Sequence, residues 1–244
     1  MKREDVKREQ LRYAFLVLKE HPYGRVMLRI LLERGFVPTA IVEEDSPLAD
    51  EERSKFLTRI AGAPRAPTIT SLTASRNIPH HTVGNHNDPA CLDLLRSLDP
   101  EIIVLGGTRI IHPPLLTIPT CGTVNAHPAL LPLLRGSASV GWALYLDLPI
   151  GCTTHVVEEG IDSGPILLQR RLPIRSGDTY ERIVRRMLTL AGELMADTLA
   201  RFAAGPVQGT PQGPGDEPRR VIPPELLEEG KARLAEESYS HFSD

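Results

Sequence analysis

Continuous apolar runs that alternate with helical patterns constrain this chain more than any other feature. The segments YAFLVL (13–18) and EIIVLGG (101–107) are almost entirely apolar, as expected of strands that are buried on both faces. The run RVMLRILLERG (25–35) has helical periodicity and ends at a glycine. Strand–helix alternation of this kind predicts an α/β fold, with a doubly wound, mostly parallel sheet between two layers of helices.

The same patterns predict the remaining elements. Further strands are expected at 36–44, 123–126, 151–159 and 165–174, and further helices at 50–62, 89–100, 137–146 and 179–205. The segment 63–80, rich in proline, serine and threonine, is predicted to be a loop. We expect one catalytic domain over 11–205. A short C-terminal extension, 206–244, follows it; its proline- and glycine-rich start is predicted to be mostly unstructured, with one short helix at 223–238.

Composition excludes several classes of protein. A chain of 244 residues with 41% hydrophobic and 24% charged residues is typical of one large folded domain. The net charge of −3 provides no basic field for nucleic acid or an anionic membrane. No apolar run reaches the roughly 20 residues that cross a bilayer, and the charged N-terminus lacks the apolar core of a signal peptide. We therefore expect a cytoplasmic protein without a membrane or nucleic-acid partner.

Ligands of such sheets bind beyond the carboxyl ends of the strands, which directs attention to the loops 19–24, 107–112 and 125–137. The first of these reads KEHPYG and has a single glycine. A dinucleotide site needs several glycines at this position, so a Rossmann-type dehydrogenase is not expected. His21, Tyr23 and Arg25 are candidate pocket residues; the alternative is an ordinary surface loop.

The tetrapeptide Asn125-Ala126-His127-Pro128 suggests chemistry at the end of a strand. Residues two apart in an extended segment point to the same side, so Asn125 and His127 can face one pocket. An asparagine amide stabilises a developing oxyanion, and a histidine transfers protons near neutral pH. The pair suits attack on a carbonyl-level carbon. A structural polar contact is the alternative.

A second segment, THVVEEGIDSGPIL (154–167), places Asp162 in a loop flanked by glycines. If this loop meets the end of the preceding strand, the Asp162 carboxylate can orient the His127 ring and stabilise its charged form. The alternative is that an aspartate between Gly160 and Gly164 serves only the chemistry of a turn.

Together, IIVLGGTRII, VNAHPALLPLLRG and THVVEEGIDSGPIL resemble the formyltransferases that use 10-formyltetrahydrofolate. The resemblance covers roughly residues 100–175, and the order and spacing of the three motifs are more specific than any one of them. It implies a formyltransferase-type Rossmann-like fold and an enzyme that transfers a formyl group from 10-formyltetrahydrofolate to a primary amine or a hydroxylamine.

The resemblance also implies roles for individual residues. Asn125, His127 and Asp162 correspond to the catalytic triad of the family: the asparagine holds the formyl oxygen, the histidine stabilises the tetrahedral intermediate or relays a proton, and the aspartate sets the state of the histidine. The pterin of the folate is expected against the loops at 108–111 and 158–162. The residues implied in donor binding are Leu105, Thr108, Arg109, Ile110, Ile111, Glu158, Glu159 and Gly160. For the apolar members of this set, a place in the core is the alternative. His155 is implied as a supporting residue.

The acceptor is less constrained. The loop 19–24 lacks the glycine–serine–asparagine pattern that holds phosphate in the glycinamide ribonucleotide enzymes, and the chain after 205 is too short for the C-terminal barrel of the methionyl-tRNA enzymes. We expect a small-molecule amine, an amino-acid derivative or an aminosugar nucleotide. Arg135, which precedes Gly136, and His86 are further candidates for substrate contact. For Arg135, a surface ion pair is the alternative. A homodimer is left open.

Two other functions and a metal site are the alternatives to this interpretation. A formyltetrahydrofolate hydrolase shares the triad, but it usually carries an N-terminal regulatory domain, for which the residues before the first strand leave no room. A non-catalytic folate- or ligand-binding module is the other rival, against which the intact triad argues. The histidine-rich segment HHTVGNHND (80–88) lacks the spacing of a metal site, so no metal is expected.

Overall fold

The computed structural model describes residues 11–60, 66–74 and 76–243. The described chain forms a seven-stranded sheet in the order β3-β2-β1-β4-β5-β6-β7. Strands β3, β2, β1, β4 and β5 are parallel, whereas β6 and β7 are antiparallel to their neighbours. The predicted doubly wound, mostly parallel α/β sheet is confirmed. The strands are β1 (Tyr13–Leu18), β2 (Ala40–Glu44), β3 (His80–Val83), β4 (Ile102–Leu105), β5 (Gly122–His127), β6 (Gly151–Val156) and β7 (Ile166–Arg171).

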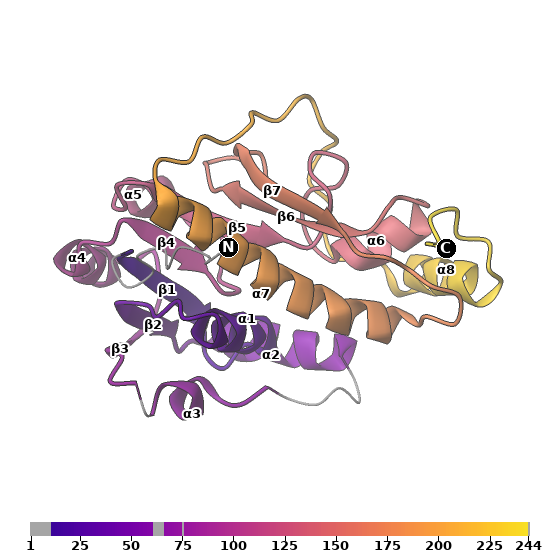
Figure 1. The fold of residues 1–244 in the computed structure, drawn as a ribbon. Coiled ribbons are helices and arrows are strands. Elements are labelled where there is room, and N and C mark those ends of the chain that lie inside the picture. Colours follow the sequence, from indigo (N-terminus) through magenta and orange to yellow (C-terminus); the bar gives the residue numbers. More distant parts are fainter. Residues whose placement is uncertain (1–10, 61–65, 75, 244) are drawn as a thin grey trace, which may run out of the picture.

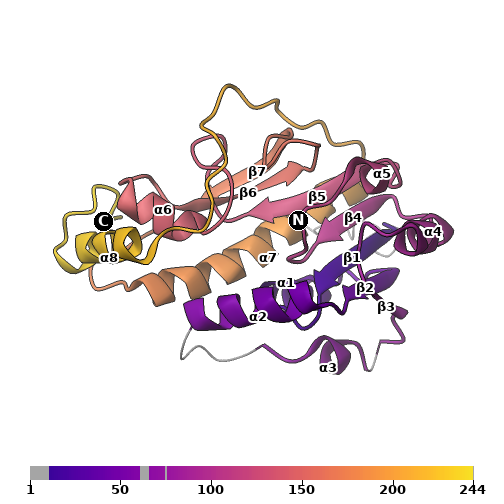
Figure 2. The same ribbon diagram turned by 180° about the vertical axis from the view of Figure 1, so that it is seen from behind.

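Helices cover both faces of the sheet, as Figures 1 and 2 show from opposite sides. On one face, α1 and α7 pack over the larger core, which includes Phe15 of β1. On the other face, α4 and α5 pack over a smaller core around Leu16. The helices are α1 (Pro22–Glu33), α2 (Pro47–Arg59), α3 (Ile69–Thr73), α4 (Pro89–Leu98), α5 (Pro113–Leu116), α6 (Ser139–Tyr145), α7 (Tyr180–Ala204) and α8 (Pro224–Ala235). Within the described ranges, no helix combines the length and apolarity needed to span a membrane.

The segment 63–80 was predicted to be a loop, and this is wrong in two places. Residues Ile69–Thr73 form α3, a helix of one short turn whose first N–H groups are capped by Thr68. His80 begins β3, an edge strand whose side chains alternate between exposed and half-buried. An edge strand does not need the continuous apolar run that marks the central strands, so the pattern was absent. Residues 63–65 and 75 lie outside the described part of the chain.

The segment between α7 and α8, residues 206–222, is here called the strap. Figures 1 and 2 show it running from the end of α7 past β6, β7 and α6 to α8. It contains no helix, but its backbone pairs with the rest of the fold at two places: Thr210 exchanges hydrogen bonds with Ile166, and Arg219 pairs with Gly136. The strap therefore lacks regular secondary structure, as predicted for a proline- and glycine-rich segment, but these two pairings hold it against the rest of the fold.

Candidate active site

The end of β5 and the loop between β6 and β7 meet at Asp162. Its carboxylate lies 3.4 Å from Nδ1 of His127 and 3.5 Å from Nε2 of His155. The strand register explains part of this arrangement, because Asn125 stands directly opposite His155 on the antiparallel β6. The backbone N–H of Gly136 donates to Asp162 Oδ2 over 2.9 Å. The structure thus brings the three predicted catalytic residues together.

His155 orients the amide of Asn125. Its Nδ1 lies 2.9 Å from the carbonyl oxygen of Val156, which can only accept, so Nδ1 carries the ring proton. Nε2 is then an acceptor, and Asn125 Nδ2 donates to it over 3.3 Å. One N–H of Asn125 is fixed in this way, and Asn125 itself lines the cavity described below.

A hydrogen bond to a backbone carbonyl also fixes the tautomer of His127. Its Nε2 lies 3.0 Å from the carbonyl oxygen of Leu134, so Nε2 carries the proton and Nδ1 presents its lone pair toward Asp162. The ring is 3% exposed. Burial lowers the pKa of His127, and the nearby Asp162 carboxylate partly opposes this. A neutral imidazole at neutral pH is able to take up a proton at Nδ1.

Asp162 is ionised. Burial works against its charge, but the combined effect of His127, His155 and the Gly136 N–H lowers the pKa of the carboxyl to about 2. The residue has a φ of 50°, in the left-handed region that aspartate tolerates in turns. A charged carboxylate beside His127 Nδ1 stabilises any proton that this nitrogen gains.

A cavity of about 830 Å³ opens beside Asn125 and Asp162. Three large apolar side chains at its wall are unusually exposed: Ile110 at 68%, Ile161 at 45% and Val221 at 54%. Such exposed apolar groups around one cavity favour a ligand that offers apolar surface. All residues expected to hold the donor line it: Leu105, Thr108, Arg109, Ile110, Ile111, Glu158, Glu159 and Gly160.

A buried network holds the loop that follows β4. Glu44, at the end of β2, is fully buried and forms a bidentate pair with Arg109 through Nε, at 2.8 Å, and Nη2. Burial opposes the charge of Glu44, but its hydrogen bonds outweigh burial and hold its pKa well below the usual range. Asn87 donates to the carbonyl of Ile110 and accepts from the N–H of His112. The loop at 108–112 is therefore fixed from the α4 side.

The five predicted substrate contacts, His21, Tyr23, Arg25, His86 and Arg135, are not among the residues that line this cavity. His86 is fully buried against Glu44 and Val42, and it supports the Glu44 network. His21 packs edge-on against Phe56 and is 7% exposed. Arg25 bonds to Glu20 and to the carbonyls of Ala66 and Pro67, beside a separate cavity between α1, α2 and α7.

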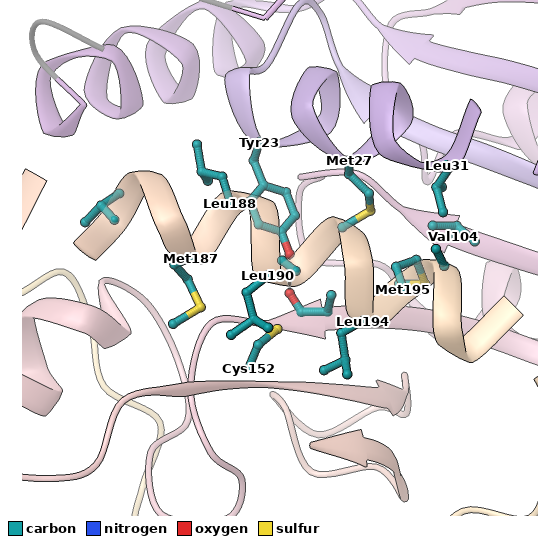
Figure 3. Close-up of a cluster of buried hydrophobic side chains, with 14 of the residues drawn as sticks. Tyr23, Met27, Leu31, Val104, Cys152, Met187, Leu188, Leu190, Leu194 and Met195 are labelled. Carbon is teal, nitrogen blue, oxygen red and sulfur yellow. Dashed lines mark hydrogen bonds between the residues drawn. The ribbon is translucent and has the colours of Figure 1, made fainter. Parts of the chain in front are cut away.

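Tyr23 is also a core residue. Figure 3 shows it between α1 and α7, beside Met27 and Leu188. Its hydroxyl donates to the carbonyl of Ala126, the residue between Asn125 and His127. Tyr23 therefore braces the catalytic strand from the side opposite the cavity. The sequence analysis expected a loop at 19–24, whereas Tyr23 belongs to the first turn of α1 and faces the core.

Arg135 lies next to the site, but its guanidinium is hydrogen-bonded to the strap. Its Nε and Nη2 donate to Oε1 of Gln212. The sequence predicted neither the contact of Gln212 with Arg135 nor the place of residues 217–221 at the cavity wall, because a proline- and glycine-rich stretch has no periodicity to indicate burial. Over the described residues, no group of three His, Cys, Asp or Glu side chains is arranged to hold a metal ion.

Comparison with known proteins assigns the chain to a family. The family model described as "Formyl transferase" matches residues 59–199, which is more than half of the chain and includes the whole triad. The chain belongs to the formyl transferase family. The family predicted from the sequence is thereby confirmed.

Curated relatives and solved structures of formyl transferases extend the comparison. Methionyl-tRNA formyltransferase of Myxococcus xanthus is 30% identical over 76% of this chain and 57% of its own length. The enzyme of the same name from Porphyromonas gingivalis is 30% identical over 85% of this chain and 61% of its own. The chain thus spans about three fifths of the length of these relatives.

Two solved structures share the fold. The formyltransferase PseJ of Anoxybacillus kamchatkensis, in complex with UDP-4,6-dideoxy-4-formamido-L-AltNAc and tetrahydrofolate, has a TM-score of 0.57, with 21% identity over 85% of this chain and 86% of that chain. Phosphoribosylglycinamide formyltransferase of Anaplasma phagocytophilum has a TM-score of 0.63, with 22% identity over 87% of this chain and 98% of that chain. The predicted Rossmann-like formyltransferase fold is confirmed.

Proposed function

We propose that this chain transfers the formyl group of 10-formyltetrahydrofolate to the primary amine of a small molecule, with Asn125, His127 and Asp162 as the catalytic residues. The observation that carries the proposal is that Asn125 and Asp162 line a cavity, with the buried His127 in contact with Asp162, and that every residue expected to bind the donor lines the same cavity. The alternatives are a hydrolase that releases formate and a binding module without catalysis.

The cavity fits a folate in size and chemistry. Its volume of about 830 Å³ lies within the range of small-molecule sites, and the exposed Ile110 and Val221 offer apolar surface to a ring system. The loops 107–111 and 158–162 bring backbone polar groups to the same space, and such groups recognise the edges of a pterin. Arg109 lines the cavity but is paired with Glu44, so it acts as a fixed part of the wall.

Asn125 is proposed to hold the oxygen of the formyl group. Its amide is oriented by the bond to His155 Nε2, and a preorganised donor stabilises the oxyanion that forms when the amine attacks the formyl carbon. Because the amide is fixed before the reaction, little reorganisation is needed as the charge develops.

His127 is proposed to take the proton that the attacking amine loses. The lone pair of Nδ1 is free for a proton, since Nε2–H is bound to the carbonyl of Leu134. Asp162 stabilises the imidazolium that results, at a distance of 3.4 Å, and the proton then passes to the folate nitrogen that leaves. When the tetrahedral intermediate collapses, the bond between the formyl carbon and the folate nitrogen breaks, and that nitrogen keeps the electron pair and takes the proton.

The net charge of −3 favours a small-molecule acceptor, an amino-acid derivative or an aminosugar nucleotide. A second candidate acceptor is methionyl-tRNA, favoured by the matches to methionyl-tRNA formyltransferases. The test is release of tetrahydrofolate from 10-formyltetrahydrofolate with a panel of amines: ornithine derivatives, aminosugar nucleotides, glycinamide ribonucleotide and methionyl-tRNA. Turnover with one small amine supports the proposal. Turnover with methionyl-tRNA alone favours the second candidate, and formate release without any amine favours the hydrolase.

A further inference from the structure

The two loops that carry the catalytic groups come from different strands. The loop at 135–137 follows β5 and provides the Gly136 N–H, whereas Asp162 belongs to the loop between β6 and β7. Between them lies the hydrogen bond from Gly136 to Asp162 Oδ2. The position of the Asp162 carboxylate relative to His127 therefore depends on what holds these two loops against each other.

Gln212 of the strap bonds to both loops. Its Nε2 donates to the carbonyl of Asp162 over 2.9 Å and to the carbonyl of Gly164 over 2.7 Å. Its Oε1 accepts from Arg135 Nη2 over 2.9 Å and from Nε over 3.3 Å. Only an amide side chain donates at one end and accepts at the other in this way. Gln212 thus links Arg135 to the backbone of the catalytic aspartate.

Further along the strap, Arg219 clamps the first loop. Its N–H donates to the carbonyl of Arg135, and its carbonyl accepts from the N–H of Ser137. Gly136, between these two residues, has a φ of +93°, and a Cβ built on it would stand 2.1 Å from the Arg219 carbonyl oxygen. Glycine is required here both by the backbone conformation and by the closeness of the strap. Trp142 Nε1 donates to the carbonyl of Arg220 and anchors the strap to α6.

We propose that the strap is an integral part of the active site and that Gln212 is a positioning residue for Asp162. By holding the Asp162 backbone and Arg135 together, Gln212 sets the separation of the Asp162 carboxylate from His127 Nδ1. Strap residues 217–221, with the exposed Val221, complete the cavity wall beside the same loops. The consequence for turnover rests on the proposed function, but the consequence for His127 does not.

The test measures the pKa of the His127 ring. In Gln212→Ala, the loop that carries Asp162 loses two hydrogen bonds, one at the carbonyl of Asp162 and one at that of Gly164. The Asp162 carboxylate then supports the His127 imidazolium less well, and the pKa of His127, measured by NMR on the unliganded protein, falls below the wild-type value. If formyl transfer occurs, kcat falls about tenfold, the order of one lost hydrogen bond, while the donor KM changes less than twofold. Gln208→Ala is the matched control, because Gln208 is exposed on the same strap and has no hydrogen-bond partner in the described part of the chain.

Two further variants keep the test decisive. Gln212→Glu still accepts from Arg135 but cannot donate to the carbonyls of Asp162 and Gly164, so a folded Gln212→Glu protein is expected to lose kcat as Gln212→Ala does. Arg135→Ala combined with Gln212→Ala should be no worse than Gln212→Ala alone, since Arg135 acts through Gln212. A folded Gln212→Ala protein with the wild-type His127 pKa overturns the proposal, even if its melting temperature or kcat falls. A wild-type protein without formyl transfer would refute the proposed function and leave the NMR result to decide the role of the strap.

Discussion

His127 Nδ1 lies 3.4 Å from Asp162 Oδ2, and its other ring nitrogen donates to a backbone carbonyl. This pairing makes the imidazole a proton acceptor whose charged form is stabilised next to it. Asp162→Asn removes that stabilisation without changing the shape of the side chain, so kcat should fall at least 100-fold. Steady-state kinetics check this, with Asp93→Asn on the surface of α4 as a control that keeps wild-type kcat. A smaller loss than tenfold would argue against the role of Asp162.

The amide of Asn125 provides the next prediction. Asn125→Ala removes an oriented donor and should lower kcat on the order of 100- to 1000-fold, with little change in the KM of the donor. Single-turnover kinetics separate the chemical step from product release. An unchanged rate of the chemical step in a folded variant would show that the formyl oxygen is held by another group.

Tyr23 is expected to act through the strand that it braces. Tyr23→Phe leaves the buried carbonyl of Ala126 without its donor, so the variant should lose about 1–2 kcal/mol of stability and several-fold in kcat. Tyr13→Phe is the matched control: Tyr13 donates to the carbonyl of Phe36 in the same core, away from the site. Denaturant unfolding and kinetics should show similar losses of stability in both variants and a loss of kcat in Tyr23→Phe alone.

The Glu44 network should govern donor binding. Glu44→Gln breaks the bidentate pair with Arg109 inside the protein, which loosens the loop at 108–112 and costs about 3 kcal/mol of stability. The donor KM should rise about tenfold, while kcat at saturation changes little. Glu43→Gln, the neighbouring carboxylate on the opposite face of β2, should leave the donor KM unchanged. Equal donor KM values in the two variants would contradict the role of the network.

His21 makes stability depend on pH. Burial, followed by nearby arginines, lowers the pKa of His21 from 6.5 to about 4, so the unfolded chain binds the proton more readily. Stability is then full above pH 6.5 and falls as the pH drops toward 4, by about 3 kcal/mol from this residue. His21→Phe keeps an aromatic ring against Phe56 and should remove most of that slope. Urea unfolding between pH 4 and 7 measures it, and an unchanged slope would refute the assignment.

The fold, and the proximity of Asn125, His127 and Asp162, were predictable from the sequence for a physical reason. Central strands such as β1 are buried on both faces and must be apolar throughout, and Asn125 and His127 share a side because a strand alternates. Asp162 sits in a glycine-flanked loop that the order of the strands brings to the same edge. The eight donor-site residues follow the same strand ends.

Other features depend on packing that leaves no local pattern. Strand β3 lies at an edge and is partly exposed, so it has no apolar run. Tyr23 and His86 are polar residues after strands, and only the packed structure reveals that they face the core and the Glu44 network. Gln212 belongs to a segment without periodicity. Only the folded structure shows that it contacts both the loop of Arg135 and the loop of Asp162, which are distant from it in sequence.

The role of His127 in formyl transfer is tested by comparing wild-type protein with His127→Gln in a 10-formyltetrahydrofolate assay that records tetrahydrofolate release with and without an amine acceptor. Calorimetry with a stable 10-formylfolate analogue monitors binding in parallel. We predict amine-dependent release by the wild type, a loss of at least 100-fold in His127→Gln, and equal binding of the analogue by both. Full turnover by a folded His127→Gln protein, or release that needs no amine, would contradict the account.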